Sequence, residues 1–254
     1  MAAASITVGA LVVAGLFAVA LTAAFRDGPA PVYVSIGDGT QMGFGVAPEA
    51  GASSLFRRYL SDQLNEPVKW WTTADGNYYT TETFIGSASG RSQLRLAEAL
   101  LQRFDEDGVD VAAVTLSIGG NDLVEVGNQC GAPPCAELYR QMRDDMVERL
   151  DVIYARINEA KDDGTPLLVL LYYNASDCGQ AGVDTSPTEL GVIGWNAAIR
   201  ETAERHGAFV VDAYTPVRGK ACDYVTNLDL NEEGNKVLAE QYLRAYEALP
   251  DEYR

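Results

Sequence analysis

The polar side chains with the clearest chemical potential lie in short turns of this 254-residue sequence. Asn121 and Asp122 directly follow two glycines, and Asp38 lies between two more. Asp229 stands shortly before the last helical segment. An Asn amide can donate a hydrogen bond to a carbonyl oxygen that gains negative charge, and a desolvated carboxylate can take a proton from water. These residue types therefore suit the activation of a carbonyl group and of a water molecule.

Metal and cofactor chemistry is not indicated. His206 is the only histidine, and the four cysteines include no C-x-x-C pair. A zinc site built from Cys and His needs closely spaced ligands, so we expect no metal and no other cofactor. Disulfides in an oxidising compartment fit the cysteines better. Three pairings are possible, of which we expect Cys130–Cys135, around a short loop, and Cys178–Cys222.

The composition is that of a globular domain, with 47% apolar and 22% charged residues. The formal net charge of −17 argues against nucleic acid as a partner, because phosphate binding needs clusters of Lys and Arg. An anionic membrane surface is disfavoured for the same reason. We interpret the acidity as an aid to solubility, and it does not define a ligand.

The first 25 residues predict export from the cytoplasm. They carry no charged side chain, and residues 6–25 form an apolar stretch long enough to span a bilayer as a helix. A cleaved signal peptide would want a basic start, which is absent, and a small-residue cleavage site, which Ala18-Val19-Ala20 supplies. We therefore expect residues 1–25 to be a membrane anchor or a signal peptide, followed by a linker at 26–31. The domain that follows is then secreted or attached to the membrane by this segment.

Apolar runs alternate with segments of helical spacing along the rest of the chain. The expected strands cover residues 32–36, 68–73, 109–118, 166–173 and 208–211, and the expected helices cover 51–65, 92–104, 135–160, 188–205 and 231–249. Strands that are apolar throughout are typical of a parallel sheet covered by helices on both faces. Ligands of such sheets bind at the carboxyl ends of the strands, where the turns described above are expected to meet.

Five motifs in these segments resemble the SGNH (GDSL-type) ester hydrolase family. They are VYVSIGDGT, GSASG, SIGGNDL, WNAAIRETAERHGAFVVDAY and LDLNEEGNKVLAE, in the family's order between residues 32 and 249. The resemblance implies one domain over residues 32–254. It also implies a flavodoxin-like, three-layer α/β/α sandwich around a five-stranded parallel sheet.

The resemblance also assigns catalytic positions, and three of them carry the wrong residue type. Gly39 stands where the family has its nucleophilic Ser, Asp229 where it has His, and Thr226 where it has Asp. The family's two oxyanion-hole positions, outside the nucleophile loop, match at Gly90 and Asn121. A Ser-His-Asp triad cannot operate without the hydroxyl and the imidazole.

Neighbouring residues offer no obvious replacement. Thr40 is one position along a tight turn, where a side chain points elsewhere, and we place it with Asp38 and Asp122 among the expected ligand-binding residues. His206 is expected at the end of a helix on the opposite edge of the sheet, in a structural role.

Two hypotheses follow from these substitutions. The first is an exported, catalytically degenerate domain that binds an ester, lipid or glycan ligand or serves as a scaffold. The second is a divergent hydrolase of lipid, acyl or acetyl-glycan esters, in which Asp229 activates a water in the space left by Gly39. The sequence leaves the ligand and the oligomeric state open.

Overall fold

A five-stranded parallel sheet forms the centre of the protein. The computed structural model describes residues 30–75, 78–86, 92–130, 135–179 and 186–253, with the backbone alone for 186–190. Residues Pro31–Arg254 form a compact unit of their own. The strands are β1 (Val32–Gly37), β2 (Lys69–Thr72), β3 (Val111–Ser117), β4 (Leu167–Leu171) and β5 (Phe209–Asp212), in the order β2-β1-β3-β4-β5.

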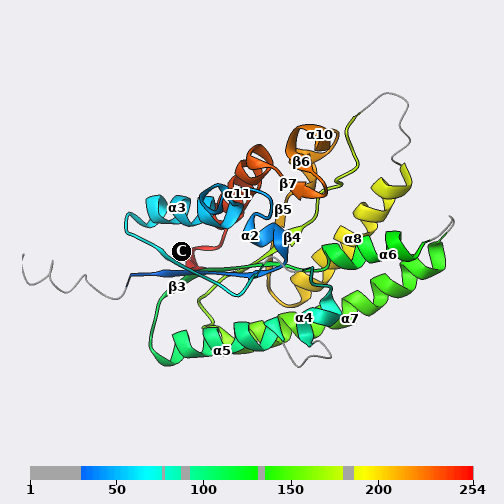
Figure 1. Ribbon diagram of the computed structural model, residues 1–254. Coiled ribbons are helices and arrows are strands. Elements are labelled where there is room, and N and C mark those ends of the chain that lie inside the picture. Colours follow the sequence, from blue (N-terminus) through cyan, green and yellow to red (C-terminus); the bar gives the residue numbers. More distant parts are fainter. Residues whose placement is uncertain (1–29, 76–77, 87–91, 131–134, 180–185, 254) are drawn as a thin grey trace, which may run out of the picture. The chain divides into compact units, whose positions relative to one another are not determined.

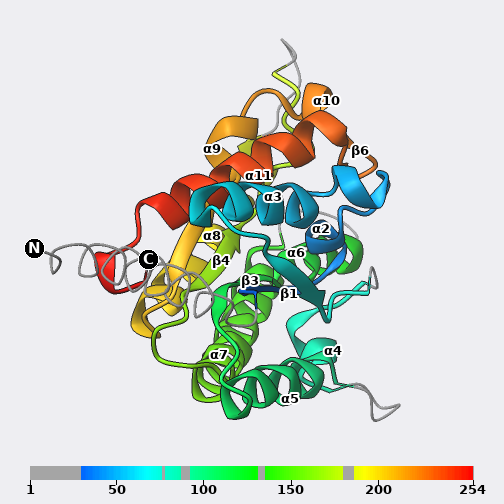
Figure 2. The ribbon, with the colours of Figure 1, turned by 90° about the vertical axis from the view of Figure 1, so that its left-hand side faces the viewer.

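Helices cover both faces of this sheet (Figures 1 and 2). One face carries α3 (Ala52–Leu64) and α11 (Glu232–Glu247), and the other carries α5 (Gln93–Glu106), α7 (Ala136–Ala160) and α8 (Ser186–Arg205). The expected three-layer α/β/α sandwich with five parallel strands is confirmed. Helices bury both faces of the central strands, as β1 and β4 show by being buried at every residue, whereas the edge strand β2 is largely exposed.

Shorter elements line the edges of the sandwich. They are α2 (Gly39–Met42), α4 (Thr81–Ile85), α6 (Gly120–Gln129), α9 (Tyr214–Val217), α10 (Ala221–Tyr224), the hairpin β6 (Val225–Thr226) and β7 (Asp229–Leu230), and 3-10 helices at Pro48–Ala50 and Asp251–Tyr253. These elements were not predicted, because segments of two to five residues are too short to show a hydrophobic period and because α6 is rich in Gly and Asn, which form helices poorly.

The order of the strands fixes the place of a ligand site. From β1 the chain passes through α3 to β2 on one side, and then through α5 to β3 on the other side of β1. The loops that leave β1 and β3 therefore diverge toward opposite layers and leave room between them at the carboxyl edge of the sheet. The hairpin β6–β7 and α2 lie together at this edge (Figure 1).

Two disulfides join loops of the domain. Cys130 is bonded to Cys135 and Cys178 to Cys222, which are the pairs expected from the sequence. Two disulfides in a domain of this size favour an oxidising, extracytoplasmic compartment. In the part of the chain that the structure describes, no helix is both long and apolar enough to cross a bilayer. Residues 1–29, which contain the expected anchor or signal peptide, lie outside the described residues.

The two disulfides are expected to differ in their effect on stability. Cys178 and Cys222 are 44 residues apart and Cys130 and Cys135 only 5, so the first restricts the unfolded chain more. Replacing both cysteines of a pair by Ser should lower the free energy of unfolding by about 4 kcal/mol for Cys178–Cys222 and about 2 kcal/mol for Cys130–Cys135. Urea denaturation of residues 27–254 measures both losses. An equal or reversed order would contradict the argument from loop length.

Candidate functional site at the carboxyl edge of the sheet

The carboxylate of Asp38, immediately after β1, is buried and joins three segments of the chain. One oxygen accepts a hydrogen bond from Ser117 Oγ at 2.8 Å and another from the backbone N–H of Thr40 at 3.1 Å. The other oxygen accepts one from the Tyr172 hydroxyl at 2.8 Å. Asp38 thereby caps α2 and ties it to the ends of β3 and β4. Burial raises the pKa of Asp38 from 3.8 to about 6, and these hydrogen bonds oppose the rise.

Two glycines allow the backbones of this edge to approach each other closely. Gly37 has a φ of 134°, and a Cβ placed there would lie 2.1 Å from the carbonyl oxygen of Ser117. Gln93 of α5 holds the same residue by accepting from its N–H and donating to its carbonyl. At Gly120 a Cβ would lie 2.4 Å from the ring of Tyr172. Any larger residue at either position would push the strand ends apart.

A buried glutamine of α2, Gln41, holds this helix in place. It was not predicted from the sequence. Gln41 is fully buried, and its amide N–H group donates to the hydroxyl oxygens of Thr115 and Tyr33. Its side-chain oxygen accepts from Tyr242 of α11 at 2.8 Å. Its backbone oxygen accepts from Ser53 Oγ at 2.7 Å. Because every polar atom of the side chain is paired, the turn that carries Gly39 and Thr40 is rigidly held.

The hairpin β6–β7 brings two further predicted site residues to the same edge. Thr226 and Asp229 are cross-strand partners, and Val225 pairs with Leu230. The turn between them is held from the sheet side, because the hydroxyl of Tyr173 donates to the carbonyl oxygen of Leu228 at 2.8 Å. β7 packs against α2, and the hydroxyl of Tyr173 lies near both the carboxylate of Asp229 and the side chain of Thr40.

Asp229 carries a carboxylate that the rest of the described chain leaves unpaired. It is partly buried, and no described residue donates a hydrogen bond to it or forms an ion pair with it. Burial alone raises the pKa of Asp229, and its charge helps to raise the pKa of the buried Tyr173 hydroxyl beside it. A carboxylate with a raised pKa is a better proton acceptor than an exposed one and a good partner for a ligand's donor.

Asn121 completes the edge in the first turn of α6, after β3. Its side-chain amide donates to the carbonyl oxygen of Tyr79 at 2.9 Å, which uses one of its two N–H bonds and leaves the other for a ligand. The hydroxyl of Tyr78 donates to the backbone oxygen of Asn121 at 3.0 Å. Asp122, by contrast, is buried, and both its oxygens accept hydrogen bonds from Thr81 at the start of α4. Gly90 lies outside the described residues.

Comparisons with known proteins agree with this arrangement. The sequence profile of the GDSL-like lipase/acylhydrolase family matches residues 35–237. The chain belongs to this family. Among solved structures, it is similar to a lipase from a goat rumen metagenome, with 16% identity and a TM-score of 0.67 over 85% of this chain and 97% of that one. No curated protein matches the chain by sequence.

Two further solved structures show the same fold. An extracellular lipase from Streptomyces rimosus is 18% identical, with a TM-score of 0.63 over 85% of this chain and 100% of its own. An acetylxylan esterase from Geobacillus stearothermophilus is 12% identical, with a TM-score of 0.57 over 88% and 96%. At these identities the likeness speaks for the fold, and the site must be judged from its own residues.

The family's nucleophile position lies at the start of α2. Gly39 is the first residue of this helix, and it is not among the glycines with a positive φ. The backbone there would therefore accept a serine without strain, so the glycine is not required by the conformation of the turn. Thr40, the nearest hydroxyl in sequence, has its backbone N–H bonded to Asp38.

The only histidine of the chain lies at the other edge of the sheet. His206 follows α8 and precedes β5, where its ring is 2.9 Å from the carboxylate of Asp151 in α7. Its backbone oxygen accepts a hydrogen bond from Asn158. This edge holds the amino ends of the strands, so the imidazole cannot serve a site built on Gly39 and Asn121.

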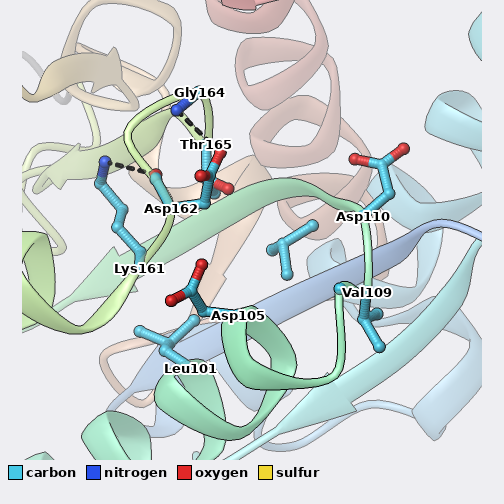
Figure 3. Close-up of a pocket in the computed structure, with 10 residues that line it drawn as sticks. Leu101, Asp105, Val109, Asp110, Lys161, Asp162, Gly164 and Thr165 are labelled. Carbon is cyan, nitrogen blue, oxygen red and sulfur yellow. Dashed lines mark hydrogen bonds between the residues drawn. The ribbon is translucent and has the colours of Figure 1, made fainter.

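A cavity of about 360 Å³ also lies at this opposite edge, beside the first residues of β3 (Figure 3). Of the three aspartates that line it, Asp162 holds a turn of the chain: its Oδ2 accepts from the N–H of Gly164 at 2.9 Å, and its backbone oxygen accepts from Lys161 Nζ. None of the family's motif residues reaches this cavity. We therefore place the candidate site at the carboxyl edge.

The raised pKa of Asp38 predicts an unusual pH dependence of stability. The folded state holds this proton more tightly than the unfolded chain, so the stabilisation is complete below about pH 3.8 and is lost as the pH rises through about 6. Relative to Asp38→Asn, the wild type should gain about 2.5 kcal/mol of unfolding free energy between about pH 7.5 and about pH 4. Urea titrations of both proteins measure this difference.

A second variant tests whether the pKa of Asp38 sets the pH window, that is, the pH range over which this stabilisation is lost. Ser117→Ala removes one hydrogen bond to the carboxylate and should move the window to higher pH, because that bond lowers the pKa of Asp38. A difference between wild type and Asp38→Asn that stays constant with pH would contradict the assignment.

Proposed function

We propose that this chain is an exported member of the GDSL-like family that no longer catalyses ester hydrolysis and binds an ester- or glycan-containing ligand at the carboxyl edge of its sheet. The observation that carries the proposal is the absence of both reactive groups from the site. Gly39 offers no hydroxyl, and the single imidazole, His206, lies at the opposite edge beside Asp151. Acyl transfer to a serine needs both groups within hydrogen-bond reach.

The groups that persist at the edge suit binding of a carbonyl compound. Asn121 keeps one amide N–H for a ligand oxygen, and Asp229 can accept a hydrogen bond from a ligand hydroxyl. A second carboxylate, Asp38, lies beneath them, so the edge disfavours anionic ligands. The structural neighbours are lipases and an acetylxylan esterase by name, which supports an uncharged lipid or acetylated glycan as the ligand class.

One observation favours a second candidate function. Asp229 has a raised pKa and no partner among the described residues, which are properties of a general base. In this alternative, Asp229 takes a proton from a water beside Gly39, and the water oxygen attacks the ester carbonyl carbon. Asn121 stabilises the oxyanion, and the alcohol leaves with the proton from Asp229.

Simple ester hydrolysis separates the two functions. Residues 27–254 should hydrolyse p-nitrophenyl acetate and butyrate no faster than a serum-albumin blank, because Gly39 supplies no hydroxyl and the imidazole of His206 lies at the other edge of the sheet. Asn121→Ala serves as the matched control and should leave this background rate unchanged. Robust wild-type activity that Asp229→Asn abolishes would overturn the non-catalytic proposal and support the water-activating alternative.

Restoring the triad should restore chemistry. Gly39→Ser alone should gain little, since a serine without a base stays protonated at neutral pH. The triple variant Gly39→Ser, Thr226→Asp, Asp229→His places all three roles on a backbone that accepts a serine at position 39 and pairs positions 226 and 229 across β6–β7. We expect on the order of 10²-fold faster ester hydrolysis than the single variant, or about 2.7 kcal/mol of barrier. Equal rates for the single and triple variants would contradict the assigned positions.

A further inference from the structure

The tip of the β6–β7 hairpin holds a leucine in a conformation that L-amino acids avoid. Asn227 and Leu228 form the two-residue turn, with φ angles of 52° and 78°. Turns of this kind need positive φ at both central residues and usually place a glycine second. Asn tolerates the left-handed region, whereas a leucine is an outlier there. The chain thus uses an unfavourable residue where a glycine would fit.

Side-chain packing does not compensate for this choice. The side chain of Leu228 is 57% exposed, so it gains little from packing. Its backbone, however, is fixed, because the hydroxyl of the buried Tyr173 donates to its carbonyl oxygen. Backbone strain at a residue that the surrounding structure holds in place is found most often at active sites and ligand-binding sites.

A second exposed apolar side chain stands on the neighbouring loop. Phe44, also 57% exposed, follows α2, which packs against β7. The two side chains therefore come from the loop of the family's nucleophile and from the hairpin of its base. Gly39 begins α2 and Asp229 follows Leu228 directly, so an apolar group bound beside Leu228 would lie next to the expected site residues.

We infer that Leu228 is a specificity-determining residue, which contacts an alkyl or aryl group attached to the carbonyl of an uncharged ligand. The inference deepens the proposed function and rests on it. The carboxylates of Asp38 and Asp229 exclude a fatty-acid anion as the preferred ligand, which leaves a neutral carbonyl compound. Phe44, on the loop that follows α2, is the second residue that we assign to this apolar contact.

Methyl ketones test this inference, because they carry an ester-like carbonyl and cannot be hydrolysed. Residues 27–254, which include the whole compact unit, are titrated with 2-butanone and 2-octanone and followed by NMR. At roughly a fourfold gain in affinity per buried methylene, partial burial of the longer chain predicts about tenfold tighter binding of 2-octanone. Leu228→Ala should reduce this preference at least about threefold.

Matched variants separate the possible causes. Leu96→Ala removes a leucine that is 62% exposed on α5 and should leave the preference unchanged. Asn121→Ala should weaken both ketones equally, because it removes the donor to the carbonyl. Leu228→Gly should lose the preference as Leu228→Ala does, yet melt about 2–4 °C higher than Leu228→Ala, because glycine relieves the positive φ.

The outcomes distinguish a failure of this inference from a failure of the proposed function. Failure of the wild type to bind either ketone would overturn both. A preference for 2-octanone that survives Leu228→Ala would overturn the role of Leu228 alone, as would equal melting temperatures of the Gly and Ala variants. A change in sedimentation of Leu228→Ala, with the ketone preference intact, would identify Leu228 as a contact between copies of the chain and would also overturn the inference.

Discussion

The buried carboxylate of Asp38 is the constraint on which the carboxyl edge of the sheet depends. Its two oxygens accept hydrogen bonds from Ser117, Tyr172 and Thr40, which belong to the ends of β3 and β4 and to α2. Replacing it by an apolar residue would leave two buried hydroxyls and a backbone N–H without partners, a loss of about 1–3 kcal/mol for each. Burial of this carboxylate is unfavourable, as its raised pKa shows. Its hydrogen bonds, however, fix the arrangement of three loops.

The residues that hold the carboxyl edge together differ from the residues at the expected catalytic positions. Asp38, Gln41 and the close approach at Gly37 lie inside the sandwich, whereas Gly39, Thr226 and Asp229 lie on its outer side. None of the three substituted positions contributes a hydrogen bond to the buried network. The residues at the positions where we expect the family's Ser, His and Asp can therefore be exchanged without loss of the loops that carry them.

The features that could be predicted from the sequence are those with a signal in a short, continuous segment. Buried parallel strands appear as unbroken apolar runs such as residues 166–171, and the turn around Asn121 follows a strand with a glycine signal. The Gln41 network could not be found in this way, because Tyr33, Thr115 and Tyr242 are far apart in sequence and carry no periodic pattern. The β6–β7 hairpin was missed for a related reason: its strands have two residues each, and its turn has a leucine in place of the glycine that marks such turns.

Leu228, at the position of that glycine, and its neighbour Asp229 support the proposal that the carboxyl edge binds a ligand. Leu228 strains the backbone, and Asp229 places a partly desolvated carboxylate without a described partner beside it. Each cost could be removed by a single substitution, to glycine at the first position and to an uncharged residue at the second. Backbone strain and partly desolvated carboxylates with raised pKa values both occur preferentially at ligand-binding and catalytic sites. Both features fall in the hairpin β6–β7, which packs against α2, so the support for a ligand concentrates where we expect the family's catalytic base.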